Sequence, residues 1–113
     1  MSSHRIEKVS ALLKREISKL INYDFAEEFG LITVSDIKVT ADFKEAVVYL
    51  SIFEQNKEMD ILDNISKKSF EYQHQLGRKL KMKFTPKLSF KIDHFQEEID
   101  KVDKLLKEID HGS

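Results

Sequence analysis

The chain has 113 residues, a length that fits one domain and leaves no room for a second hydrophobic core. Its composition is 41% hydrophobic and 35% charged, with one proline and three glycines, which is typical of a folded domain and excludes long disordered segments. The absence of cysteine excludes disulfide and thiol chemistry. No apolar run approaches the roughly 20 residues of a membrane-spanning helix, and the N-terminus lacks the apolar stretch of a signal peptide. We therefore expect a cytoplasmic protein that does not contact a membrane.

The formal net charge of −1 conceals a strong segregation of charge along the chain. Residues 67–91 carry eight basic side chains against a single acidic one, Glu71, whereas residues 24–66 carry three basic and ten acidic side chains. The first 23 residues hold five basic and two acidic side chains. Because a local electrostatic field depends on where charges lie and not on their sum, the basic segment needs its own explanation.

The first predicted element is an amphipathic helix over residues 4–22. Its apolar residues recur at spacings of three and four and form one stripe, which includes Ile6, Val9, Leu13, Ile17 and Leu20. At about 100° per residue, the opposite face of this helix is basic and carries Arg5, Lys8, Arg15 and Lys19. A turn region is expected next, with Gly30 just before the following strand.

Two strands joined by a short turn follow in the predicted order. The first covers residues 31–40, and its apolar positions change strand phase between Val34 and Ile37, which predicts a bulge near residues 35–36. The second covers residues 45–53 and is apolar on both faces, which is typical of an interior strand. We expect the two strands to form a hairpin.

A helical stretch with an internal kink is predicted next. Asn56 or Asp60 is the expected N-cap. The apolar register weakens over residues 66–71, where the sequence SKKSFE favours a kink. Pro86 biases the residue before it towards an extended conformation, so the second helix is expected to end near Lys83.

The final predicted elements are a third strand and a C-terminal helix. The sequence KLSFKI, residues 87–92, alternates strictly between apolar and polar side chains, and residues 95–109 show a helical apolar stripe. The predicted fold class is α+β, with a three-stranded sheet covered by helices on one face. We assign residues 1–94 to one domain and residues 95–113 to a C-terminal helix and tail, which is part of that domain or appended to it.

The concentration of positive charge indicates an anionic ligand. Eight cations with one acid repel one another, and pairing in space with the acidic segment 24–66 would offset that repulsion. Binding to a polyanion, with release of its counterions, is the better explanation. Besides the four basic residues of the first helix, the candidate contact residues are Lys67, Lys68, Arg78, Lys79, Lys81 and Lys83.

Aromatic residues between these cations favour RNA as the polyanion. Tyr72, His74 and Phe84 are interleaved with the basic residues, and single-stranded or irregular RNA is held by phosphate contacts and base stacking. Packing in the hydrophobic core nevertheless explains Phe84 and Tyr72 more often than contact with a base does.

Two other classes of function were weighed. The four histidines show no metal-ligand spacing, and the chain has neither a glycine-rich phosphate loop nor a nucleophile elbow, so we expect neither a metal site nor a catalytic residue. A protein–protein adaptor remains open, because the apolar second face of the strand over residues 45–53 could bind a partner.

Four segments, in matching order over nearly the whole chain, together resemble the ribosome-binding factor A (RbfA) family. They are RIEKVSALLKREISKLI, VTADFKEAVVYLS, LGRKLKMKFTPKLSFKID and DKVDKLLKEI. The resemblance implies a KH-like fold of the type II order and a monomer that binds the free small (30S) ribosomal subunit and its 16S rRNA. It also implies assistance in late rRNA maturation, notably 5′-end processing, and in growth in the cold, with no cofactor and no catalytic residue. A general KH-like RNA-binding module remains the alternative.

The sequence departs from this family at the expected kink. The family usually places an Ala-x-Gly pattern there, whereas this chain has SKKSF at residues 66–70 and no glycine. A serine, either Ser66 or Ser69, can bend a helix by bonding back to its own backbone, although less sharply than glycine. Lys67 and Lys68 are then expected to supply charge where the family supplies backbone access.

Overall fold

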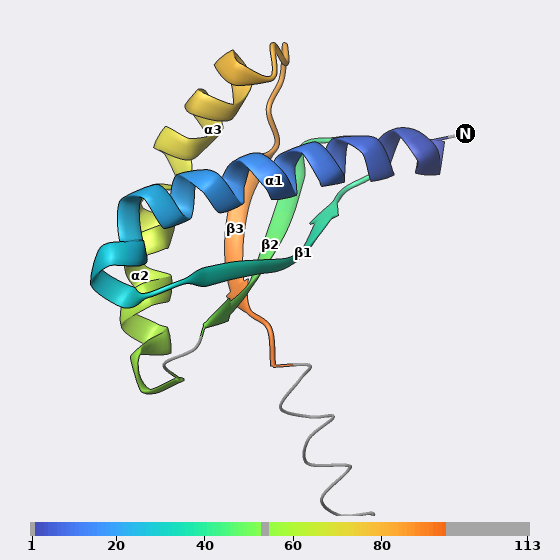
Figure 1. Ribbon diagram of the computed structural model, residues 1–113. Helices are drawn as coiled ribbons and strands as arrows, with labels where there is room; N and C mark the ends of the chain where they lie inside the picture. Colours follow the sequence, from blue (N-terminus) through green and yellow to red (C-terminus); the bar gives the residue numbers. More distant parts are fainter. Residues whose placement is uncertain (1, 53–54, 95–113) are drawn as a thin grey trace, which may run out of the picture.

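The helices and strands follow the predicted order in the computed structural model, which describes residues 2–52 and 55–94. The helix expected over residues 95–109 lies outside the described residues. Figure 1 shows the arrangement of the elements. They are α1 (Ser2–Phe29), β1 (Ile32–Val39), β2 (Glu45–Ile52), the short 3-10 helix η1 (Gln55–Lys57), α2 (Glu58–Lys67), α3 (Ser69–Lys79) and β3 (Lys87–Ile92). None of the described helices is both long and apolar enough to cross a membrane.

The sheet has the strand order β1-β2-β3, so β2 is the interior strand that its apolar faces predicted. β1 pairs with β2 antiparallel, as the expected hairpin, and β3 pairs with β2 in parallel. The register of the hairpin shifts between Val34 and Asp36, which confirms the predicted bulge. Because of this shift, Val34 and Ile37 both point into the core although they lie three residues apart.

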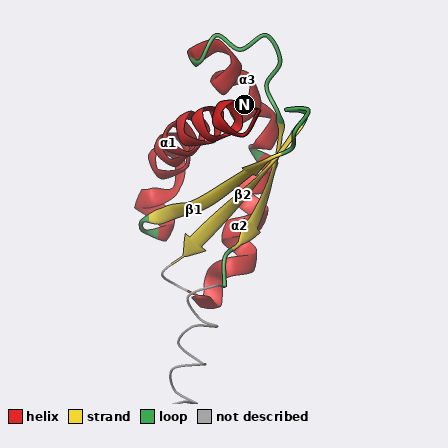
Figure 2. Ribbon diagram, turned by 90° about the vertical axis from the view of Figure 1, so that its right-hand side faces the viewer, coloured by secondary structure: helices red, strands yellow, loops and turns green. Residues whose placement is uncertain are grey.

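The helices lie on one side of the sheet, as Figures 1 and 2 show, and the buried side chains of the strands point to that side. In β3 the predicted alternation is confirmed, since Leu88 and Phe90 are buried. Lys87 and Lys91 are exposed on the opposite face. The fold class is therefore α+β, in the KH-like order.

Helix α1 is longer than the sequence pattern predicted. It continues to Phe29 and not to residue 22, because Phe25 and Phe29 extend the apolar stripe at a spacing of four. The expected turn region is therefore mostly helical. Gly30 follows the last residue of the helix. Its φ of 78° lies in the left-handed region that favours glycine, and its N–H donates to the carbonyl oxygen of Ala26 over 2.8 Å.

The start of α2 also differs from the prediction. Lys57 occupies the N-cap position without a side-chain hydrogen bond, because η1 leads directly into the helix. Asn56 therefore lies in η1. Asp60 lies in the first turn of α2, where its negative charge interacts favourably with the positive end of the helix dipole. Neither residue is the cap.

The predicted kink lies at Lys68, between α2 and α3. Ser69 does not bond back to its own helix, since its hydroxyl donates to the carbonyl oxygen of Leu88 in β3 over 2.7 Å. The buried Tyr72 donates its hydroxyl to Asp24 of α1 over 2.7 Å. Burial, reinforced by this carboxylate, raises the pKa of Tyr72 far above its usual value, so the hydroxyl remains a donor. Contacts with β3 and α1 thus hold the kink.

Candidate nucleic-acid interface

Basic residues of α1 and α3 meet around one buried carboxylate, that of Glu16. Lys79 Nζ of α3 lies 2.8 Å from Glu16 Oε2. On α1 itself, Arg15 Nε and Lys19 Nζ lie 3.3 and 3.5 Å from Glu16 Oε1. The side chain of Glu16 is 4% exposed, whereas each of the three cations is 61% exposed. The cations of this Glu16 cluster therefore face solvent.

The three surrounding cations favour the ionised form of the Glu16 carboxylate. The hydrogen bond from Lys79 holds the pKa of Glu16 below its usual value, with help from the charge of Lys19 and against the opposing effect of desolvation. One negative charge thus holds three positive ones, which leaves an excess of positive charge at the surface. Exposed cations gathered in this way can donate charge-assisted hydrogen bonds to phosphate oxygens.

The loop between α3 and β3, residues 80–86, carries two more of the predicted cations. The prediction that α3 extends to Lys83 is wrong, because the helix ends at Lys79 and Lys81 adopts a positive φ of 54°. The chain then turns back on α3, and the N–H of Met82 donates to the carbonyl oxygen of Gly77 over 3.0 Å. Lys81 and Lys83 therefore project from a loop and are exposed.

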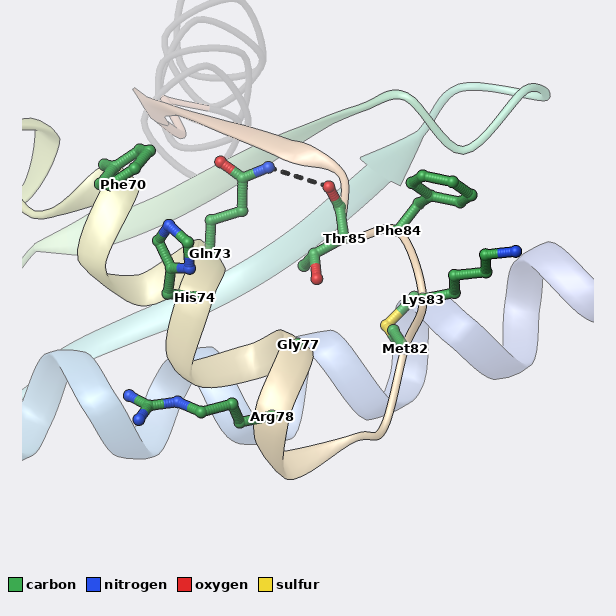
Figure 3. A pocket seen from close by; sticks show the side chains of 9 residues that line it. All are labelled: Phe70, Gln73, His74, Gly77, Arg78, Met82, Lys83, Phe84 and Thr85. Atoms are coloured by element: carbon green, nitrogen blue, oxygen red, sulfur yellow. Dashed lines mark hydrogen bonds between the residues drawn. The ribbon is translucent and has the colours of Figure 1, made fainter.

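The loop packs closely against α3. Gln73 Nε2 donates to the carbonyl oxygen of Thr85 over 2.9 Å, a contact drawn in Figure 3. A Cβ at Gly77 would lie only 2.7 Å from Thr85 Oγ1, so only glycine fits there without a shift. The buried Pro86 anchors the loop to the start of β3.

A groove of about 550 Å³ lies between α3 and this loop. Two exposed aromatic residues border it, since Phe70 is 72% and Phe84 is 77% exposed. The assignment of Phe84 to the core is therefore wrong, whereas Tyr72 is buried as expected. The lining, shown in Figure 3, consists of Phe70, Gln73, His74, Gly77, Arg78, Met82, Lys83, Phe84 and Thr85.

A second groove, of about 710 Å³, lies on the other side of the same loop. Here the loop faces the N-terminal part of α1 and the β1–β2 turn. Arg5 lies over the ring of Phe43, 5.3 Å from its centroid, and both residues line this groove together with Lys83 and Phe84. The structure thus brings Arg5 close to the loop cations, while Lys8 lies exposed further along α1.

The cations at the kink are neutralised. Lys67 pairs with Asp63 over 3.3 Å, and Lys68 lies 3.6 Å from Asp24 and 3.7 Å from Glu71. Asp63 and Asp24 belong to the acidic segment 24–66. The alternative explanation of the basic residues, that they pair in space with this segment, therefore holds for Lys67 and Lys68.

The cations of α3 and its loop differ from those of the kink. Within residues 2–52 and 55–94, no ion pair joins Arg78, Lys81 or Lys83 to a carboxylate. The sequence reasoning also overlooked Glu16 and Phe70, which border this surface. Glu16 gives no signal on its own, because its partner Lys79 is distant in the sequence. Among the described side chains, no group of three or more potential ligands could hold a metal ion.

The comparisons with known proteins agree with this picture. The model of the family described as "Ribosome-binding factor A" matches residues 5–106. A ribosome-binding factor A from Bdellovibrio bacteriovorus is 37% identical over 108 residues, which cover 94% of this chain and 81% of that protein. One from Caldanaerobacter subterraneus is 32% identical over 109 residues, covering 94% of this chain and 89% of that protein.

Solved structures of the same family share the fold. The crystal structure of ribosome-binding factor A from Thermus thermophilus has a TM-score of 0.69 at 24% identity and covers 77% of this chain and 93% of that protein. A Thermus thermophilus RbfA homology model, fitted into a cryo-EM map of a 30S–RbfA complex, has a TM-score of 0.64 at 25% identity and covers 74% and 90%. The chain therefore belongs to the ribosome-binding factor A family.

Proposed function

We propose that this protein binds the free 30S ribosomal subunit in the cytoplasm as a monomer and assists late maturation of its 16S rRNA. The observation that carries the proposal is the Glu16 cluster, because it joins the cations of α1 and α3 into one exposed basic surface. Family membership and the 30S–RbfA complex of the Thermus thermophilus relative support the ribosome as the partner.

The contact surface in this proposal consists of α1, the end of α3 and the loop 80–86. Three cations of this surface belong to the Glu16 cluster, namely Arg15, Lys19 and Lys79. Three more have no carboxylate partner in the described part of the chain, namely Arg78, Lys81 and Lys83. Each contact with a phosphate releases counterions from the rRNA. Lys67 and Lys68 contribute less, because nearby carboxylates already neutralise them.

Co-sedimentation with ribosomal particles tests this proposal. We expect the protein to be recovered with free 30S subunits and to be largely absent from joined ribosomes, since a maturation factor leaves when maturation ends. Equal occupancy of both particles would contradict the proposal and favour a general RNA-binding module. Binding that survives ribonuclease treatment of the subunits would favour a protein–protein adaptor.

The maturation role has its own test. Cells that lack the protein should accumulate 16S rRNA with an unprocessed 5′ end, more strongly in the cold. Normal 5′ ends at all temperatures would contradict the role in maturation and leave only ribosome binding.

A further inference from the structure

The groove between α3 and the loop 80–86 has features that the proposed contact with phosphates does not use. Phosphate contacts are made by charged or polar donors, whereas this groove is bordered by the exposed apolar rings of Phe70 and Phe84. Large aromatic side chains that stay exposed in one groove are typical of a binding site. The groove therefore calls for a ligand with an aromatic or apolar face.

The two aromatic rings are not equally available. Phe70 packs edge-on against His74, with ring centroids 4.4 Å apart. Among the described aromatic residues, none packs against the ring of Phe84, and the ammonium of Lys83 lies 5.7 Å from the centroid of that ring. Phe84 is thus the better platform for stacking.

The polar groups of the groove indicate the rest of the ligand. The lining contains no acidic side chain, and Arg78 and Lys83 extend from it in opposite directions in Figure 3. This arrangement suits an apolar ring with negative charge on either side of it. A nucleotide within an RNA strand has that pattern, because a phosphate precedes and follows each base.

The size and the hydrogen bonding of the groove fit such a ligand. A volume of about 550 Å³ lies within the range of small-ligand sites. One amide N–H of Gln73 donates to the carbonyl oxygen of Thr85, and Gly77 packs closely against the side chain of Thr85. These contacts hold the loop against α3 within the groove. Recognition through stacking is tolerant of sequence, because every base has a π-face.

We infer that this groove binds one unpaired base of the rRNA, stacked on Phe84, while the neighbouring phosphates lie against Arg78 and Lys83. The inference rests on the proposed function and adds to it the kind of rRNA that is recognised, namely a nucleotide outside a double helix. It also explains why Phe84 remains exposed in a loop whose neighbouring residues are bonded to α3.

The test uses fluorescence anisotropy at low salt to compare the binding of two short RNAs to the protein. One is a labelled single-stranded hexamer of mixed sequence, and the other is the same ribose-phosphate chain without bases. We expect the wild-type protein to bind the intact hexamer at least about fivefold more tightly than the abasic one. Phe84→Leu should abolish this preference, whereas Phe84→Trp should keep it.

Two control variants separate stacking from charge and from a general loss of aromatic surface. Lys83→Gln should weaken the binding of both hexamers by a similar factor, because both carry phosphates. Tyr23→Leu removes an aromatic ring that is 90% exposed on α1, away from the groove, and should leave the preference unchanged. Phe84 is exposed, so its variants should melt at the wild-type temperature.

Equal affinity of the wild-type protein for the two hexamers, or no binding of either, would overturn the inference. A Phe84→Leu variant that loses affinity for 30S subunits without any change in hexamer preference would also overturn it, since the groove would then contact a ribosomal protein. If the preference holds while the wild-type protein fails to co-sediment with 30S subunits, the base site stands and the proposed function fails.

Discussion

Lys79 of α3 donates a hydrogen bond to Glu16 of α1 over 2.8 Å, and this contact joins two basic stretches that lie far apart in the sequence. Arg15 and Lys19 lie close to the other oxygen of the same carboxylate, at 3.3 and 3.5 Å. Glu16 therefore offsets part of the repulsion among the cations and fixes their positions before any ligand arrives. Preorganisation of this kind lowers the entropy cost of binding.

The Glu16 cluster predicts a specific dependence of stability on pH. The lowered pKa of Glu16 means that its contribution to stability is present above the ordinary value of 4.5 and is lost as the pH falls through the folded-state pKa. Wild-type protein should melt at a higher temperature than Glu16→Gln at neutral pH, and this difference should close below pH 4.5. Thermal melts of both proteins at a series of pH values measure it.

The matched control for this experiment is Glu27→Gln, which changes an exposed glutamate of the same helix. Its melting temperature should follow that of the wild-type protein at every pH. A difference between wild-type protein and Glu16→Gln that does not change with pH would contradict the assigned role of the ionised carboxylate.

The hydrogen bond between Tyr72 and Asp24 predicts a loss of stability when the hydroxyl is removed. Tyr72→Phe should lower the free energy of unfolding by about 1–3 kcal/mol, because the bond is made to a charged acceptor and its donor is buried. Urea unfolding measures the change. Tyr23→Phe, on a side chain that is 90% exposed, is the control and should have no effect. Equal stability of the two variants would mean that this bond does not hold the kink.

Because Gly77 lies close to the loop, we expect Gly77→Ala to lower the stability of the protein and Thr85→Ala to restore it. Gly77→Ala should cost roughly 1–3 kcal/mol, because the added Cβ would lie 2.7 Å from Thr85 Oγ1. Hydrogen exchange at the amide of Met82 should quicken, since that amide bonds to the carbonyl oxygen of Gly77.

Thr85→Ala removes the oxygen with which the new Cβ collides. The double variant should therefore recover most of the stability that Gly77→Ala loses, while Thr85→Ala alone changes little. Purely additive effects of the two substitutions in thermal melts would argue against this contact.

The phase of β3 predicts different effects for two neighbouring substitutions. Phe90 is 7% exposed and packs in the core, so Phe90→Ala should cost roughly 3–5 kcal/mol. Ser89→Ala, on the exposed face of the same strand, should cost little. Thermal melts that rank the two variants in the opposite order would show that the strand phase is wrong.

The elements that could be predicted from the sequence are those set by local patterns. Strict alternation predicted β3, and the change of phase between Val34 and Ile37 predicted the bulge. The predicted ends of α1 and α3 were less accurate. α3 ends at Lys79 because Lys81 adopts a left-handed φ and the N–H of Met82 bonds back to the carbonyl oxygen of Gly77. Glycine usually occupies the left-handed position of such a helix end, and the sequence has a lysine there, so this signal was missing. The extension of α1 to Phe29 did have a local signal, the spacing of Ile21, Phe25 and Phe29, which the predicted end at residue 22 did not use.

The candidate site was predictable in its charge but not in its arrangement. The sequence locates the cations, but it does not show that Lys68 faces Asp24 or that Lys79 faces Glu16, because both pairs form only in the folded chain. The exposure of Phe84 was also hidden, since a phenylalanine close to a predicted strand is more often buried than exposed.

If the exposed cations of the loop 80–86 contact rRNA phosphates, they should contribute to the salt dependence of 30S binding. Each phosphate contact contributes about −0.7 to −0.9 to the slope of log affinity against log salt concentration. Replacing Lys81 and Lys83 together by glutamine should weaken binding and flatten the slope by roughly one to two units. The control removes the same charge from the open face of the sheet, with Lys38 and Lys91 replaced by glutamine, and should leave the slope unchanged. A slope that is unchanged in the Lys81 and Lys83 variant, or equally flattened in the control, would show that the loop cations do not make specific contacts with rRNA phosphates.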